Sequence, residues 1–175
     1  MKLLTKILLA CLIISAVFIS CKDDNDNNVI TSQDRTFLVQ ASLSNNAEIE
    51  AGTLASTKGD SSAIRDYGQM MVTDHTQAQT DLKTTGTNVN VNVTDSIDAT
   101  HAALIVTLTG LSGREFDSAY ILNQITDHQA TIAAFQTELN SGSRSEVLNY
   151  ANTYLPKIQM HLQKADSIAI AMGFK

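Results

Sequence analysis

The sequence predicts an all-α protein, and three observations support this prediction. Apolar residues recur at steps of three and four over four long segments, the spacing of helices with one buried face. Alternation of apolar and polar residues occurs only at residues 88–93, where the asparagines favour an extended connector over a strand. Residues 32–175 show no internal repeat and are long enough for one domain with its own core.

The first 20 residues have the pattern of a cleavable signal peptide. Two lysines precede an apolar run at residues 7–19. This run is shorter than the roughly 20 residues that a membrane-spanning helix needs. It ends at Ser20-Cys21 and resembles the lipobox of bacterial lipoproteins, although Phe18 stands where leucine is more usual. We therefore expect cleavage before Cys21 and acylation of its side chain; the alternative is an ordinary signal peptide with an incidental cysteine.

The residues after the cysteine indicate a destination and a tether. Lys22-Asp23-Asp24 resembles the lysine–acidic export signal that sends Bacteroidetes-type lipoproteins to the outer face of the outer membrane. Residues 21–31 are expected to be a disordered tether, so the membrane partner would be reached through the N-terminal lipid. Without residues 1–20 the chain has 10 basic and 18 acidic residues, a formal charge of −8. Such a chain repels phosphates, which argues against nucleic-acid binding.

Two helices are expected first, at residues 32–58 and 61–85, and Gly86 is a natural C-terminal cap for the second. A long connection follows at residues 87–111. It contains a short predicted helix at residues 96–109, for which Asp95 is the expected cap.

The third and fourth long helices are expected to begin at residues 112 and 143. Both starts carry the Ser-x-x-Glu pattern of a capping box. Pro156 falls inside the fourth helix and should kink it. The long connection separates two helix pairs and favours a ferritin-like four-helix bundle with a short extra helix. An up-down-up-down bundle with a small fifth helix is the alternative.

One metal-ligand side chain lies near the middle of each predicted buried face. These residues are Glu48, His75, His128 and His161. At 1.5 Å per residue, their offsets along the helices amount to about 5 Å or less, so the four side chains can converge at one level. Three imidazoles and a carboxylate suit one Zn, Fe or Cu ion. The alternative is a metal-free core in which the histidines hydrogen-bond to carboxylates or tyrosines.

Other polar residues lie near these positions. Asp74 and Asp127 each precede one of the histidines and could support ligands on a neighbouring helix by hydrogen bonds. A solvated position is favoured for both, because adjacent residues on a helix point about 100° apart. His101 is expected to pack against apolar neighbours on the short helix. A di-iron site is disfavoured, since the positions three residues before the histidines hold valine or isoleucine instead of glutamate.

Several motifs together resemble a bacterial family catalogued as domain of unknown function 4142. They lie at residues 48–55, 71–75, 111–113, 116–117, 120, 128, 155–156 and 161–162. The resemblance spans about residues 34–169 and implies an exported, ferritin-like helical bundle. It includes Glu48 and the three histidines, and it implies no activity, substrate or cofactor.

Two functions of different classes fit these observations. The first is an envelope lipoprotein that binds or handles a transition metal. The second is a cofactor-free structural or interaction protein of the outer membrane. An oxidoreductase would need a redox metal and an open coordination position, and the sequence indicates neither. No pattern of catalytic residues points to a reaction.

Overall fold

The structure, a computed structural model, describes residues 29–175, which form five α-helices and no strand. The helices are α1 (Ser32–Lys58), α2 (Ser62–Asn88), α3 (Ala99–Gly110), α4 (Gly113–Ser141) and α5 (Ser145–Ala171). The predicted all-α class is confirmed. The expected signal peptide, Cys21 and most of the expected tether lie outside the described residues. Within residues 29–175, no helix is both long and apolar enough to cross a membrane.

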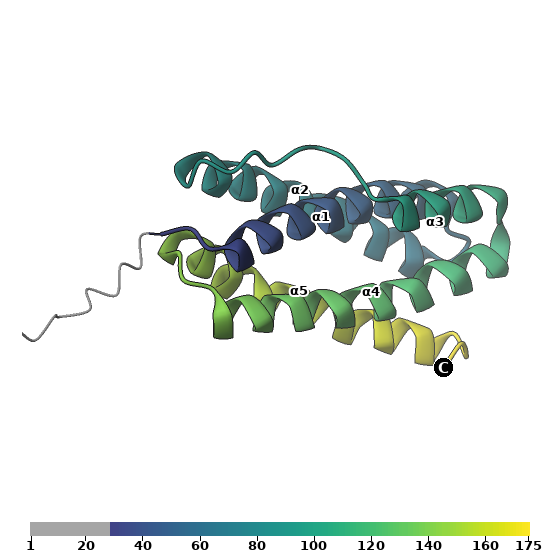
Figure 1. Cartoon of the computed structure of the whole chain (residues 1–175). Helices are drawn as coiled ribbons and strands as arrows, with labels where there is room; N and C mark the ends of the chain where they lie inside the picture. The colour runs from purple at the N-terminus through teal and green to yellow at the C-terminus, as the bar shows by residue number, and fades with distance from the viewer. Residues whose placement is uncertain (1–28) are drawn as a thin grey trace, which may run out of the picture.

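The four long helices pack as two antiparallel pairs (Figure 1). One pair is α1–α2 and the other is α4–α5; between the pairs, α1 packs on α4 and α2 on α5. Ser44 of α1 bonds Thr131 of α4, whereas Asp60, just after α1, bonds Asp117 near the start of α4. These contacts make α1 and α4 antiparallel, so α2 and α4 run in the same direction.

The connection from α2 to α4 runs back along the outside of the bundle and includes α3, which packs on α1 and α4 (Figure 1). α2 extends to Asn88, so Gly86 lies inside the helix and is not its cap. A Cβ atom on Gly86 would lie 2.6 Å from Cγ2 of Val93 and 2.8 Å from the carbonyl oxygen of Val91. Glycine therefore lets the connection approach α2 closely.

The predicted start of α3 is also corrected. α3 begins at Ala99, and the carboxylate of Asp98 accepts a hydrogen bond from the His101 backbone N–H. Asp95 cannot serve as this cap, because its carboxylate binds Lys83 and the Gln79 side chain of α2.

The two predicted capping boxes do not form. Ser112 precedes α4 without a side-chain capping bond, and the residue before α5 is Arg144, again without one. The turn before α5 is instead bound from another helix. The carboxylate of Asp34 on α1 accepts hydrogen bonds from the backbone N–H groups of Ser143 and Arg144, at 2.9 and 3.1 Å. Pro156 lies on the exposed side of α5, which continues through it.

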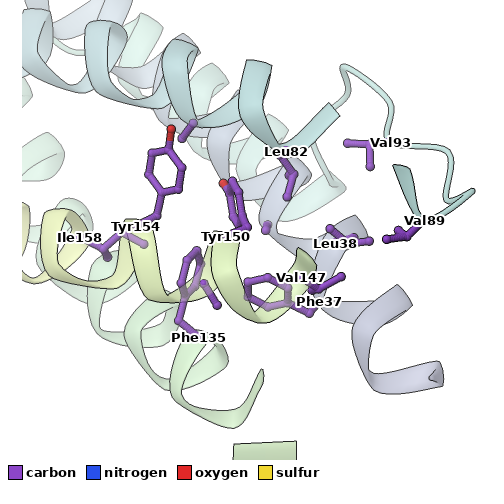
Figure 2. Packing of buried hydrophobic residues seen from close by; sticks show 13 residues of the cluster. Phe37, Leu38, Leu82, Val89, Val93, Phe135, Val147, Tyr150, Tyr154 and Ile158 are labelled. Carbon is purple, nitrogen blue, oxygen red and sulfur yellow. The ribbon is translucent and has the colours of Figure 1, made fainter. Parts of the chain in front are cut away.

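The predicted buried faces meet in two apolar clusters, one toward each end of the bundle. The first cluster includes Phe37, Leu82, Phe135 and Tyr150, and Figure 2 shows Val89 and Val93 of the connection as part of it. The second includes Ile64, Tyr67, Phe116 and Tyr120. Between the clusters, each long helix places at least one buried polar side chain, and these side chains form the site.

Candidate metal centre

A layer of buried polar side chains separates the two apolar clusters. We call it the polar layer; its members are Asn45, Glu48, His75, Gln124, His128 and His161. Each residue has at most 5% of its surface exposed. The three histidines come from α2, α4 and α5, while α1 contributes the asparagine and the glutamate.

The structure brings together the three histidines that the sequence places at one level. Their ring centroids are 5.9 Å apart for His75 and His128, 5.4 Å for His75 and His161, and 5.5 Å for His128 and His161. One nitrogen from each ring lies within 4.8 Å of the other two. An ion that binds at about 2.0–2.1 Å needs its nitrogens within about 4.2 Å of one another, so nitrogens up to 4.8 Å apart would have to move closer to share one ion.

One nitrogen of each ring is held by an oxygen of the protein. Nδ1 of His75 lies 3.0 Å from the side-chain oxygen of Asn45. Nδ1 of His128 lies 2.9 Å from the backbone carbonyl oxygen of Gln124. Nε2 of His161 lies 2.8 Å from a carboxylate oxygen of Asp74. Since these oxygens are acceptors, each of the three nitrogens carries the proton.

The opposite nitrogens therefore carry lone pairs. They are Nε2 of His75, Nε2 of His128 and Nδ1 of His161, all buried and all without a hydrogen-bond partner among the described residues. Leaving a buried polar atom without a partner costs about 1–3 kcal/mol. Three such atoms in one cluster require a physical explanation.

Protonation of the rings does not supply that explanation. Burial lowers the pKa of His128 and of His161 to about 4. Burial, together with the other two histidines, holds the pKa of His75 well below its usual value. All three rings are therefore neutral near pH 7, the form in which imidazole binds metals.

Glu48 lies outside the triangle of histidines. One of its carboxyl oxygens accepts a hydrogen bond from the Gln124 side chain at 2.7 Å, and the other is 3.5 Å from Nδ1 of His128. That contact is on the protonated side of the His128 ring, away from its free nitrogen. Burial raises the pKa of Glu48 to about 8, against the lowering effect of Gln124. Glu48 therefore lies against the protonated side of the His128 ring and is not in the cluster.

The two aspartates of the repeated Asp-His pattern have different surroundings. Asp74 reaches across from α2 to His161 on α5, the neighbouring-helix contact that the sequence allowed but did not favour. Asp127 contacts none of the three clustered histidines by a hydrogen bond; its carboxylate lies 3.8 Å from Nε2 of His101. His101 is only partly buried, and it contacts the Asp98 carboxylate through Nδ1 at 2.7 Å as well as lying near apolar residues of α3.

Two residues that hold His75 and His128 were not predicted from the sequence. Gln124 is one turn before His128 on α4, and Asn45 is three residues before Glu48 on α1. Both positions share a helical face with the residues already singled out. That spacing was a usable signal, since amides at buried positions need polar partners.

A narrow pocket between α2 and α5 reaches two of the clustered histidines. Its lining includes Asp74, His75, Tyr154, Lys157 and His161. The side chain of Asp74 is 28% exposed, whereas that of His161 is 2% exposed. Asp74 thus lies between the solvent and the buried His161 ring.

Comparisons with known proteins assign a family and a fold. The model of a family described as a domain of unknown function (DUF4142) matches residues 20–168. No curated protein matches the chain. The crystal structure of a DUF305 fragment from Deinococcus radiodurans is similar, with a TM-score of 0.71, 13% sequence identity, and coverage of 82% of this chain and 97% of that one. At this identity the likeness shows a shared fold alone.

Proposed function

The chain belongs to the DUF4142 family, as its motifs predicted, and since that family is described only as a domain of unknown function, we propose a function from the chemistry of the site. The protein binds one transition-metal ion between His75, His128 and His161. The observation that carries this proposal is a buried cluster of three histidines, each with one ring nitrogen that has no hydrogen-bond partner among the described residues and with one nitrogen of each ring within 4.8 Å of the others.

A metal ion satisfies these lone pairs better than water does. A water molecule has two hydrogens, so it can donate to only two of the three ring nitrogens. A cation accepts all three lone pairs at once. The oxygen behind each ring fixes the tautomer and the orientation of the ligand, the arrangement seen around metal-binding histidines in general.

The ligand set narrows the choice of metal to Zn, Fe or Cu. Imidazole nitrogen suits these ions, while Mg and Ca prefer oxygen ligands. Three protein ligands leave at least one coordination position for water or another small ligand. We propose binding or handling of the metal without assigning a reaction.

We also propose that the fold is a ferritin-like four-helix bundle with α3 in its long connection. The common direction of α2 and α4 and the length of the connection between them support it. In an up-down-up-down bundle, these two helices would run in opposite directions.

We further propose that the protein is an outer-membrane lipoprotein, exposed at the surface and anchored through Cys21. The apolar run before Cys21 and the Lys22-Asp23-Asp24 sequence after it support this proposal. Metabolic labelling with a fatty-acid analogue should label the wild-type chain and not Cys21→Ser. Equal labelling of both, or none of the wild type, would contradict the anchor.

The metal proposal is tested by elemental analysis of the whole purified chain and of four single variants. The chain has four histidines, and His101 is the one outside the cluster, so His101→Gln is the matched control. Wild type and His101→Gln should retain close to one metal ion per chain. Replacing His75, His128 or His161 by Gln should weaken affinity more than about a hundredfold, because each change removes a direct ligand.

The same experiment separates the metal site from a cofactor-free structural protein. If the cluster is structural only, the wild-type chain will contain no metal, and added Zn, Cu or Fe will not raise its melting temperature. That result would overturn the proposal. A rise that His128→Gln abolishes and His101→Gln preserves would support it.

A further inference from the structure

A groove of about 450 Å³ lies between α1 and α4, on a different side of α4 from the histidine cluster. Its middle is lined by small side chains on both helices: Ala41, Ser44, Ala130, Thr131 and Ala134. Because these side chains are short, the two helices do not fill the space between them. The volume is in the range of pockets that hold small molecules.

The two ends of the groove differ in chemistry. At one end, the rings of Phe37 and Phe135 meet edge to face with centroids 4.8 Å apart. At the other end lie Asp98 and His101 of the α3 start and Asp127 of α4. The His101 ring stands between the two carboxylates, 2.7 Å from Asp98 and 3.8 Å from Asp127.

The charges at the polar end are not balanced by any cationic side chain of the groove. No Lys or Arg is among the described residues that line it. One His faces two carboxylates, so this end attracts cations whatever the charge of the ring. An occupant that matches both ends has an apolar body and a positively charged head.

We propose that this groove binds an amphiphilic organic cation, an amine that carries an aryl or alkyl chain. The ammonium group lies against the carboxylate of Asp127, and the apolar body extends along Ala130 and Ala134 to Phe135. Asp127 and Phe135 are eight residues apart on α4, roughly 12 Å. A phenyl ring on a four-carbon amine spans about this length. The proposal is independent of the metal site.

The test is a calorimetric titration of the whole chain with 4-phenylbutylamine. 4-Phenylbutanol and 4-phenylbutyrate have the same apolar body and a neutral or negative head, so they are the matched probes. The amine should bind at least about tenfold more tightly than either, because a hydrogen-bonded ammonium–carboxylate contact is lost with the other heads. Equal binding of the three probes, or no binding of the amine at millimolar concentration, overturns the proposal.

Two variants locate the binding. Ala134→Phe fills the groove and should abolish binding, whereas Ala133→Phe, at the exposed neighbouring position, should leave it unchanged. Asp127→Asn should weaken amine binding about tenfold and leave 4-phenylbutanol unaffected. Asp66→Asn, at an exposed position on α2, is its control.

Other outcomes count against the groove as a small-molecule site. If Ala134→Phe does not fold, Asp127→Asn with the three probes still decides the question. If amine affinity is the same in wild type and Asp127→Asn, the polar end does not recognise the ammonium and the proposal fails. Sedimentation that shows a dimer of the wild type and a monomer of Ala134→Phe would make a second chain the occupant instead. Metal content should not change in Asp127→Asn or Ala134→Phe.

Discussion

At the scale of single residues, each clustered histidine is held by a different kind of oxygen. Asn45 offers an amide, Gln124 a backbone carbonyl and Asp74 a carboxylate. Only the carboxylate carries a charge, so it strengthens its ring as a ligand most. Because the backbone carbonyl cannot be removed by substitution, the side chains of Asn45 and Asp74 are where this support can be tested.

Asp74 and Asp127 provide a matched pair for that test. Each precedes a clustered histidine, but only Asp74 hydrogen-bonds one of them. Asp74→Asn should weaken metal affinity about 10- to 100-fold, the usual cost of losing such support. Asp127→Asn should change it little. Competition with a coloured chelator measures both, and equal losses would show that general negative charge matters instead of the contact with His161.

Glu48 provides the second residue-scale prediction, because its place outside the triangle departs from the ligand role expected from sequence. Glu48→Gln keeps the shape of the side chain and an oxygen that can accept from Gln124. Metal affinity should fall less than about tenfold, compared with more than about a hundredfold for His128→Gln. If both variants lose affinity to the same extent, Glu48 is a direct ligand.

At the scale of helices, the close contact of α1 and α2 depends on two glycines. A Cβ on Gly68 would lie 2.7 Å from both Cβ of Ala55 and the backbone nitrogen of Ser56, and 2.8 Å from the carbonyl oxygen of Gly52. Two of these three neighbours are backbone atoms and cannot move independently. The α1–α2 pair therefore has no room for a side chain at this point.

Gly68→Ala should lower the free energy of unfolding by roughly 1–3 kcal/mol, the cost of overfilling a close-packed interface. Gly110→Ala is the control, because a Cβ there meets nothing within 4 Å. It should be neutral or slightly stabilising, since alanine favours a helix by up to about 1 kcal/mol over glycine. Urea unfolding measures both, and a neutral Gly68→Ala would mean that the helices can separate without loss.

The carboxylate of Asp34, near the start of α1, binds the turn before α5, and Glu138, near the end of α4, contacts Asp34. Burial raises the pKa of Asp34, but hydrogen bonds from Thr31, Ser143 and Arg144 outweigh this and hold it at about 2. Burial and the hydrogen bond to Asp34 raise the pKa of Glu138 to about 7, although Gln33 lowers it. Glu138 thus keeps its proton at mildly acidic pH and the two side chains do not repel each other.

The contact between Asp34 and Glu138 predicts that the free energy of unfolding falls as the pH rises. Below about pH 4.5, Glu138 is protonated in both folded and unfolded chains and contributes no pH dependence. Between about pH 4.5 and 7, the unfolded chain releases the proton while the folded chain keeps it, so the free energy of unfolding decreases, by roughly 3 kcal/mol at most. Asp34, with its lowered pKa, has the opposite dependence, and its contribution is lost only in acid below about pH 4.

Glu138→Gln should remove the fall between about pH 4.5 and 7 and be more stable than wild type near pH 8. Glu50→Gln, which changes an exposed glutamate on α1, is the control and should keep the wild-type profile. Urea unfolding at several pH values gives the comparison. Parallel profiles for wild type and Glu138→Gln would show that the carboxyl pair does not control this dependence.

The sequence predicted the helices better than their ends. Spacing of apolar residues located the buried faces, because burial follows helical period whatever the neighbours are. The caps of α3 and α5 were predicted wrongly, because a cap depends on which groups are free. Asp95 is occupied by α2, and Asp34, 109 residues before Ser143, reaches the start of α5 from another helix. The sequence around a helix end does not show which capping groups are bound by residues far away in the chain.

Part of the candidate site was also predictable from the sequence, namely the level at which its side chains lie. The three histidines share one level because they share mid-helix positions, which the sequence contains. Which nitrogen of each ring faces the centre depends on partners from other helices, such as Asp74 on α2 for His161 on α5. Glu48 has the same level as the histidines but turns toward Gln124. The level of each side chain along its helix follows from the sequence, whereas the direction in which it points depends on how the helices pack.

At the scale of the whole molecule, the polar layer crosses the boundary between the two helix pairs. His75 belongs to the α1–α2 pair, while His128 and His161 belong to the α4–α5 pair. An ion bound by all three would tie the pairs together at the level where the apolar core is interrupted. Any opening that separates the pairs would have to release the ion.

Metal binding should therefore slow hydrogen exchange of the most protected amides in all four long helices. An excess of metal at about 100 times the dissociation constant adds about 2.7 kcal/mol to the free energy of opening, or about a hundredfold slower exchange. α3 supplies no ligand and packs mainly on α1 and α4, so its amides, if they exchange by local opening, should not respond. Exchange is measured on wild type, His128→Gln and His101→Gln with and without zinc. Slowing confined to residues next to the histidines would show that the ion stabilises the site locally and does not join the two helix pairs.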